Sequence, residues 1–144
     1  MIENTESNRY NLILDEVNSR WNCTFTRSPL KIEFPNNDTN KGCGWDEIDQ
    51  TIISQYNTVK VVVQTVNDLK GKKVGSSDSE LSSVDINLTT FYNDGSNHYA
   101  GDTQTYNGNP ITLSYKYGNN PIKQIFLNSR NCKVQVKEVY LTNE

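Results

Sequence analysis

The stretch IKQIFLNSR, residues 122–130, alternates apolar and polar side chains with a period of two. Ile125 and Leu127 fall on one side of this pattern, and the other side carries Gln124, Phe126 and Asn128. A period of two places successive side chains on opposite faces of a β-strand, so we expect a strand with one buried face. Its second face would present amides and a ring instead of the Lys, Glu, Thr and Ser of an ordinary outer sheet surface.

The same period recurs in three other long segments of the chain. SSVDINLTTFY (82–92) alternates apolar with polar residues, and NTVKVVVQTV (57–66) is a β-branched run. CKVQVKEVYL (132–141) changes phase after Val136, which predicts a β-bulge near Lys137-Glu138. Shorter strands fit five further segments: 10–17, 21–26, 30–34, 42–48 and 111–117.

Turn signals rich in Gly, Pro, Asn and Asp separate these segments at short intervals, and a short helical turn fits residues 46–55. Nine or ten strands with regular turns predict an all-β protein, an antiparallel β-sandwich of the jelly-roll type. We expect residues 1–9 to be a disordered N-terminal tail and residues 10–144 to form a single domain.

Composition excludes several classes of function. The net charge is −3 and no basic stripe is present, which argues against nucleic-acid binding. No apolar run approaches the length of a membrane span, and MIENTESN lacks the features of a signal peptide. The three cysteines, Cys23, Cys43 and Cys132, contain no CxxC spacing, so a zinc finger or redox motif is not expected. They fit either one disulfide with a free thiol or three buried free thiols.

Catalytic groups are scarce. His98 is the single histidine, and we interpret it as a solvent-exposed loop residue because no hydrolase motif accompanies it. Glycoside hydrolysis needs two carboxylates across a cleft. The candidates are Asp46, Glu47 and Asp49 beside Trp45, together with Asp85, but no spacing selects a pair. We therefore expect that the protein is not an enzyme.

Polar residues and rings share one face on three of the predicted strands. These residues are Gln64 beside Lys60 and Val62, then Asp85, Asn87, Thr89 and Phe91, and finally Gln124, Phe126 and Asn128. If the strands are neighbours, these side chains form one platform of amides and rings. Aromatic rings pack against the C–H faces of sugars, and amides pair with sugar hydroxyls, so the pattern favours carbohydrate binding over an ordinary outer sheet.

Two tryptophans and one hairpin complete the set of candidates. Trp45 in GCGWDEID (42–49) fits a sugar platform or the core equally well, because the neighbouring glycines indicate a bulge or a close backbone approach. Trp21 alternates with Cys23 and Phe25, which favours the core. Asn93-Asp94-Gly95 predicts a hairpin that would bring Tyr92, Tyr99 and Gln104 to the platform edge.

The segments GCGWDEID, YNTVKVVV (56–63), IKQIFLNS (122–129) and VQVKEVYL (134–141) occur in an order that resembles the β-jelly-roll carbohydrate-binding modules of secreted plant-cell-wall hydrolases. The resemblance covers about residues 42–141. It implies a binding cleft on the concave sheet, with the face of Gln124, Phe126, Asn128, Asp85, Asn87 and Phe91 along it. Because tryptophans are few, it favours soluble chains, such as β-glucan, xyloglucan, xylan or mannan, over crystalline cellulose.

The resemblance also implies a secreted, monomeric module attached to a glycoside hydrolase. It implies a structural calcium with ligands from Asp15, Glu16 and Glu138, and no other cofactor. Two other classes of function stay open on the sequence. One is an adhesion or scaffold module, which predicts a contiguous hydrophobic or charged patch. The other is a small polysaccharide lyase or hydrolase that depends on Asp46, Glu47 or Asp85.

Overall fold

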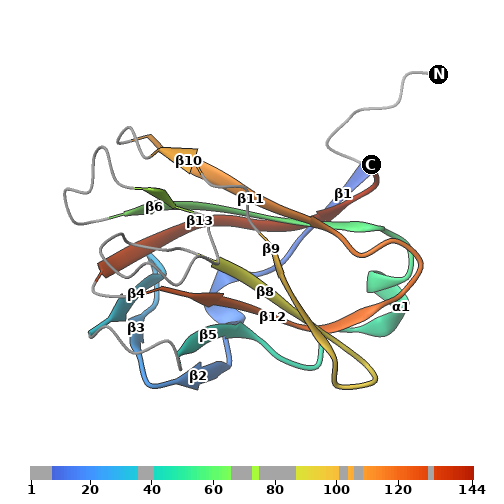
Figure 1. Cartoon of the computed structure of the whole chain (residues 1–144), viewed down its shortest axis with the longest axis horizontal. Helices are drawn as coiled ribbons and strands as arrows, with labels where there is room; N and C mark the ends of the chain where they lie inside the picture. The colour runs from blue at the N-terminus through green and yellow to red at the C-terminus, as the bar shows by residue number, and fades with distance from the viewer. Residues whose placement is uncertain are drawn as a thin grey trace.

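The fold is taken from a computed structural model that describes residues 8–35, 41–65, 73–74, 87–100, 104–105, 109–129 and 132–144. Two antiparallel β-sheets pack face to face as a sandwich, with the six-stranded sheet above the five-stranded sheet (Figure 1). Every strand pair in these two sheets is antiparallel. The predicted all-β sandwich is confirmed.

The six-stranded sheet has the order β11-β6-β13-β4-β3, and β1 also pairs with β13. Its strands are β11 (Ile111–Lys116), β6 (Thr58–Thr65), β13 (Cys132–Thr142), β4 (Lys31–Phe34), β3 (Thr24–Thr26) and β1 (Arg9–Asn11). The five-stranded sheet has the order β2-β5-β12-β8-β9. Its strands are β2 (Ser19–Trp21), β5 (Gly42–Trp45), β12 (Ile122–Asn128), β8 (Asn87–Tyr92) and β9 (Asn97–Ala100).

Three shorter features lie outside the two sheets. β7 (Lys73–Val74) and β10 (Gln104–Thr105) pair with each other as a separate two-stranded ladder. The helix α1 (Gln50–Ile53) lies within the predicted helical turn, and the Asp49 side chain caps it by accepting from the Thr51 backbone N–H. A 3-10 turn, η2 (Leu14–Glu16), replaces the second half of the strand predicted at 10–17.

The described part of the chain has more strands than the nine or ten predicted. The segment 21–26 is divided between β2 and β3 because Asn22 adopts a positive φ of 55°. Asparagine tolerates this conformation better than most residues, and it interrupts the alternation of side chains along a strand.

The core lies between the inner faces of the two sheets. Val59, Val61 and Val63 of β6 face Leu88 of β8 and Ile125 of β12, and all five are fully buried. The β13 pairing shifts register between Val136 and Glu138, so Val134 and Val136 are buried before the shift, and Val139 and Leu141 after it. The predicted bulge is confirmed, and it lets one long strand keep its apolar residues inward along its length.

Candidate functional site

The outer face of the five-stranded sheet brings together polar and aromatic residues from adjacent strands. Phe126 of β12 lies opposite Thr89 of β8, and Gln124 lies opposite Phe91. Residues directly opposite one another in an antiparallel pair project on the same side of the sheet. Their neighbours Ile125 and Leu127 are buried, so this side is the outer one. Of the three strands predicted to form one platform, the two at 122–128 and 87–92 are therefore neighbours.

Three aromatic side chains cross this face. Phe126 and Phe91 make an edge-to-face contact, with ring centroids 5.6 Å apart and planes at 90°. On the other side of Phe126, its ring covers Gly42 of β5, where a Cβ would lie 3.5 Å from the ring. Gly42 pairs with Trp21 of β2, so the indole projects from the same face. We call Trp21, Phe126 and Phe91 the aromatic row.

Amide groups lie beside the aromatic row. Asn128 donates through Nδ2 to the Thr89 hydroxyl at 2.7 Å, a bond that joins β12 to β8. The side-chain oxygen of Asn128, Oδ1, has no hydrogen-bond partner among the described residues. The Gln124 amide is half-buried and makes no hydrogen bond to a described residue. Free donors and acceptors beside partly exposed rings are suited to ligands whose hydroxyls lie around apolar surfaces.

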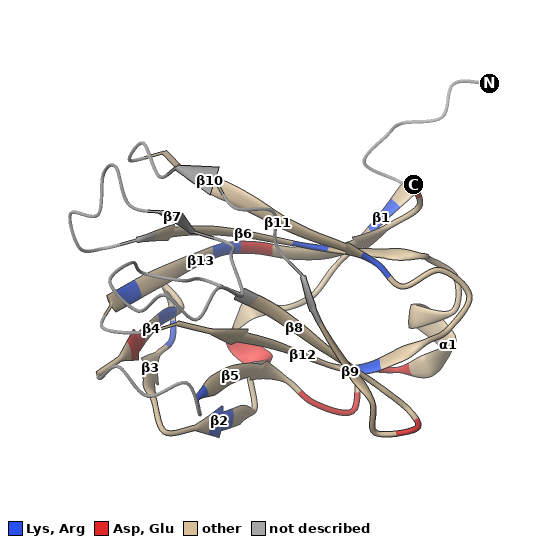
Figure 2. Cartoon of the chain, in the orientation of Figure 1, with Lys and Arg blue, Asp and Glu red and all other residues tan. Residues whose placement is uncertain are grey.

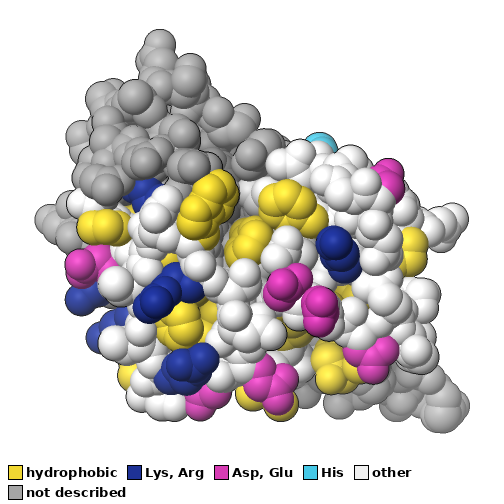
Figure 3. Space-filling model, turned by 90° about the horizontal axis from the view of Figure 1, so that it is seen from below, with side chains coloured by type: hydrophobic (Ala, Val, Ile, Leu, Met, Phe, Trp, Pro, Cys, Tyr) yellow, Lys and Arg dark blue, Asp and Glu magenta, His cyan; other side chains and the backbone are white. Residues whose placement is uncertain are grey.

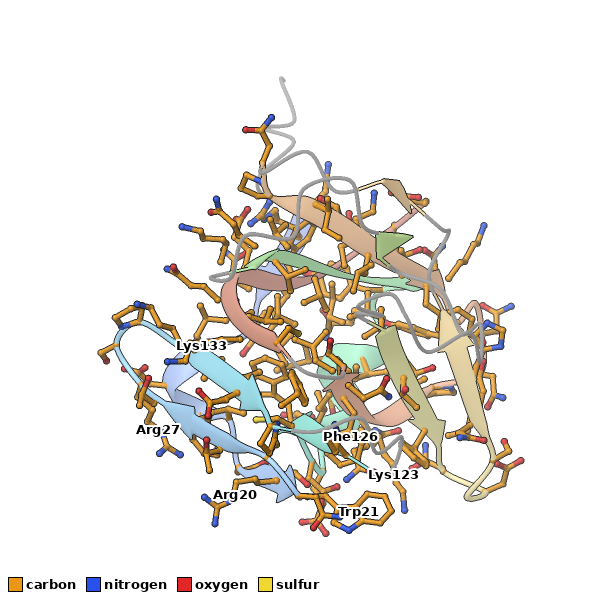
Figure 4. The ribbon with its side chains drawn as sticks, turned by 60° about the vertical axis from the view of Figure 1, so that its left-hand side comes forward. Arg20, Trp21, Arg27, Lys123, Phe126 and Lys133 are labelled. Carbon is orange, nitrogen blue, oxygen red and sulfur yellow. The ribbon has the colours of Figure 1, made fainter. Side chains whose placement is uncertain are left out.

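The two tryptophans occupy places different from those predicted. Trp45 is 4% exposed in the core, and its indole N–H donates to the Ile13 carbonyl, so it is not the open platform that we listed as a candidate. Trp21 was predicted to be core, yet it is 51% exposed. The turn at Asn22 separates Trp21 from Cys23, so the alternation that pointed inward does not apply to Trp21. Figure 4 shows Trp21 and Phe126 together on the lower side of the molecule.

Two further candidates lie away from the aromatic row. Gln64 belongs to β6 of the six-stranded sheet, so the prediction that it shares the platform is wrong. Tyr92 turns toward the inner side of the five-stranded sheet, where its hydroxyl bonds to that of Tyr115 and the two rings meet edge to face. His98 is exposed, as predicted, but it lies on β9 and stacks on Tyr115 with ring centroids 4.2 Å apart.

Four predicted residues lie wholly or partly outside the described residues. Asp85 falls within residues 75–86, which the structure does not describe. Asn87 and Tyr99 are placed by their backbone pairing alone, opposite Asn128 and Thr89, which is the register of the outer face. Gln104 belongs to the separate ladder, opposite Val74, rather than to the hairpin partner of β8.

The carboxylates predicted to hold calcium are not gathered into a site. Glu138 pairs with Arg9, and Asp15 accepts from the Ser28 hydroxyl at 2.8 Å. Glu16 lies in η2 and is exposed. Across the described residues, no group of three His, Cys, Asp or Glu side chains could hold a metal ion. The three predicted ligands therefore do not form a common cluster.

All three cysteines are free and buried. Of the two alternatives left open by the sequence, this matches three buried free thiols rather than one disulfide. Cys23 donates from Sγ to the Gly42 carbonyl at 3.1 Å. A hydrogen bond from the Cys43 thiol lowers the pKa of Cys23 to about 7, and the same contact together with burial raises the pKa of Cys43. The pair lies beneath the β2–β5 edge that presents Trp21.

Hollows lie around the margin of the five-stranded sheet. One, of about 510 Å³, lies between η2 and α1, and its walls include Asp15, Glu16, Asp46, Glu47 and Asp49. A second, about 470 Å³, connects Asp46 and Glu47 with Lys123 and Gln124 at the near end of the platform. A third, about 400 Å³, lies beside Trp21 at the far end. Figure 3 shows hydrophobic side chains at several places on this side of the molecule, with acidic and basic side chains interspersed among them.

Comparisons with known proteins identify the fold. The structure is similar to a mutant of the family 29 carbohydrate-binding module CBM29-2 complexed with cellulohexaose, with a TM-score of 0.60 at 7% identity, over 94% of this chain and 92% of that one. It is also similar to CBM86, a low-affinity xylan-binding module from Roseburia intestinalis, with a TM-score of 0.55 at 17% identity, over 92% and 93% of the two chains. PfGH50B matches with a TM-score of 0.60 at 12% identity, over 93% of this chain but 23% of its own.

Neither a protein-family model nor a curated protein matches the sequence. The structural matches nevertheless define the class: the chain has the β-sandwich fold of carbohydrate-binding modules. Within the described residues, no helix has the length and apolar character needed to cross a membrane.

Proposed function

We propose that this protein is a non-catalytic carbohydrate-binding module that binds a single polysaccharide chain across the outer face of the five-stranded sheet. The aromatic row carries the proposal. Trp21 and Phe126 come from strands two apart, β2 and β12, so their backbones are separated by roughly 10 Å at the usual strand spacing. This separation is close to the length of a disaccharide in an extended β-linked chain, so alternate sugars could pack on successive rings.

The geometry of the rings favours a soluble chain over a flat crystal surface. Phe91 and Phe126 are perpendicular, so the aromatic row does not present coplanar rings. Gln124 and Asn128 supply amide groups on the two sides of Phe126 along β12, where they can pair with equatorial sugar hydroxyls. β-Glucan, xyloglucan, xylan and mannan are the candidate ligands. The fold shared with modules described as bound to cellulohexaose or as xylan-binding supports this substrate class.

The proposed role is to target an attached glycoside hydrolase to its substrate outside the cell, with the module itself monomeric. The match to a segment of PfGH50B supports this role, because the same fold there accounts for 23% of a longer chain. The carboxylates Asp46 and Glu47 have no clear acid–base partner, and Asp46 accepts the Glu47 backbone N–H. In the proposal these acids take no part in chemistry.

Binding assays with alanine variants of the aromatic row test the proposal. Affinity electrophoresis and calorimetry would be run against soluble β-glucan, xyloglucan, xylan, mannan and pectin. We expect Phe126→Ala and Trp21→Ala each to weaken binding at least about tenfold, because each removes a ring from the contact surface. Tyr10→Ala is the matched control, since Tyr10 is an exposed ring on the six-stranded sheet.

The outcomes separate the proposed function from its rivals. Unchanged binding in both row variants, or a loss of equal size in Tyr10→Ala, contradicts the proposed surface. Absence of binding to every polymer contradicts carbohydrate binding itself. Release of new reducing ends during incubation of the unmodified protein with any polymer contradicts the non-catalytic assignment.

A further inference from the structure

We propose that the aromatic row selects an acidic polysaccharide, one that carries uronic acid residues, and that Arg20 binds the uronate carboxylate. This inference rests on the proposed function and names the substrate class of the same site. It starts from the charge distribution. The protein has a net charge of −3, yet its described residues 19–35, 41–45 and 132–135 contain five Lys or Arg and one acid, Glu33. Lys133 pairs with that acid at 3.6 Å.

These basic residues lie at one end of the sandwich. Figure 2 shows them on β2 and around β3, β4 and the start of β13, whereas the acids near α1 lie toward the opposite end. Arg20 and Arg27 are near enough to the buried Cys43 thiol to favour its charged form. Arg27 donates to the Asp15 and Val17 backbone carbonyls, and its guanidinium lies 4.7 Å from the centroid of the Phe25 ring, so these contacts hold it in place.

Arg20 lines a hollow together with Trp21, so it is open to a ligand. It is exposed, and it makes no hydrogen bond or ion pair with any residue that the structure describes. It precedes Trp21 on β2, the edge strand at the far end of the aromatic row (Figure 4). Arg20 pairs with Cys43 and Trp21 with Gly42, so the two exposed side chains leave β2 on opposite sides. A chain that crosses Phe126 and Trp21 would therefore have to continue over this edge to reach the guanidinium.

A hollow at this edge has the chemistry to hold a charged sugar. Its volume is about 400 Å³, and it is lined by Arg20, Trp21, Asn22, Cys23, Thr24 and Pro35. The indole offers an apolar surface, and the guanidinium offers a planar pair of donors that matches the two oxygens of a carboxylate. A neutral sugar would pack on the indole of Trp21 but would offer no carboxylate to the Arg20 guanidinium, which would stay hydrated.

The test compares polymers that share a backbone and differ in charge. Each neutral polymer from the panel is paired with a carboxylate-bearing form of the same backbone: glucuronidated xylan for xylan, and glucans or mannans with a small fraction of primary alcohols oxidised to uronates. We expect the unmodified protein to bind the uronate form about tenfold more tightly at low salt, because charge-assisted hydrogen bonds are about twice as strong as neutral ones. We expect this preference to shrink as salt screens the exposed charges.

Variants assign the preference to one residue. We expect Arg20→Gln to abolish the preference and to leave affinity for the neutral polymer within about twofold. Lys116→Gln removes the same charge from β11 on the other sheet and should keep the preference. Arg20→Lys keeps the positive charge but loses the planar pair of N–H donors. We expect this variant to retain part of the preference.

Each failure has its own meaning. Equal affinity of the unmodified protein for the two polymer forms overturns the uronate assignment and leaves the proposed function standing. A preference that survives in Arg20→Gln, or binding to dextran sulfate as tight as to the uronate polymer, overturns specific recognition by Arg20. A protein that binds no polymer of either kind overturns both proposals.

Discussion

At the scale of single residues, the Phe126 ring packs beside Gly42 with room for one more carbon atom. The ring lies over the Gly42 backbone at van der Waals distance from where a Cβ would be. A residue larger than alanine at this position would displace the ring from the sheet, and the aromatic row would lose its middle member.

Cys23 and Cys43 form a coupled pair of thiols beneath the same edge. The hydrogen bond from Cys43 lowers the pKa of Cys23 to about 7, while Cys43 resists ionisation. We expect one thiol of the folded protein to ionise near pH 7, and Cys43→Ala to move that ionisation upward, toward the ordinary range of cysteine. Thiolate ultraviolet absorbance followed from pH 6 to 10 measures this change, with Cys132→Ala as the control.

The sign of the linked stability follows from the lowered pKa of Cys23. Ionised Cys23 favours the folded state, so its contribution is present above the unfolded pKa and is lost as pH falls through about 7. The raised pKa of Cys43 acts in the opposite direction, because its neutral form favours folding and is lost at high pH. A Cys23 titration that Cys43→Ala leaves unchanged would contradict the coupling.

At the scale of elements, β5 can lie this close to β12 because Gly44 has no side chain. A Cβ on Gly44 would lie 1.8 Å from the Ile125 carbonyl oxygen, which is far inside any real contact. The sequence pattern of glycines flanking a strand predicted a close backbone approach, and this prediction is confirmed at Gly44. The backbone of β5 therefore lies close to that of β12. Trp45 of β5 is buried, and Gly44 lies opposite Phe126.

We expect Gly44→Ala to destabilise the protein by more than about 3 kcal/mol, since the β5 and β12 backbones must move apart. Gly42→Ala in the same strand is the matched control. Its Cβ would meet the Phe126 ring at 3.5 Å, an ordinary contact, so a change of at most about 1 kcal/mol is expected. Urea unfolding measures both changes. Equal destabilisation by the two substitutions would contradict the close approach at Gly44.

At the scale of the whole molecule, the two sheets have different outer surfaces. The five-stranded sheet presents the aromatic row and its amides, whereas β6 and β13 of the other sheet present side chains engaged in ion pairs, such as Lys60 with Glu144 and Arg9 with Glu138. A glycan should therefore contact one sheet only. This asymmetry gives the proposed function a test that needs no substitution.

Backbone amide NMR spectra recorded during titration with a binding oligosaccharide provide that test. We expect shift changes in β2, β5, β12 and β8, and none of similar size in β11 and β6. Changes spread evenly over both sheets would indicate non-specific binding. Changes centred on η2 and α1, around the acidic hollow, would move the site away from the aromatic row.

Most of the fold could be read from the alternation of side chains. The strands at 57–66, 122–130 and 132–141, and the bulge near Glu138, follow from which residues must be buried. The strands at the N-terminal end were less accurately predicted because their boundaries depend on one backbone conformation, at Asn22, that the side-chain pattern does not report. The same conformation reversed the prediction for Trp21.

The sequence by itself determined that the chain is an antiparallel sandwich and that Gln124, Phe126 and Asn128 share one exposed face. It could do so because alternation along a strand is a local property of the backbone. Only the tertiary structure decided which strands are neighbours. That choice separated Gln64 from the platform, buried Trp45, and placed Trp21 beside Phe126, because strand order depends on the packing of the whole core rather than on any one segment.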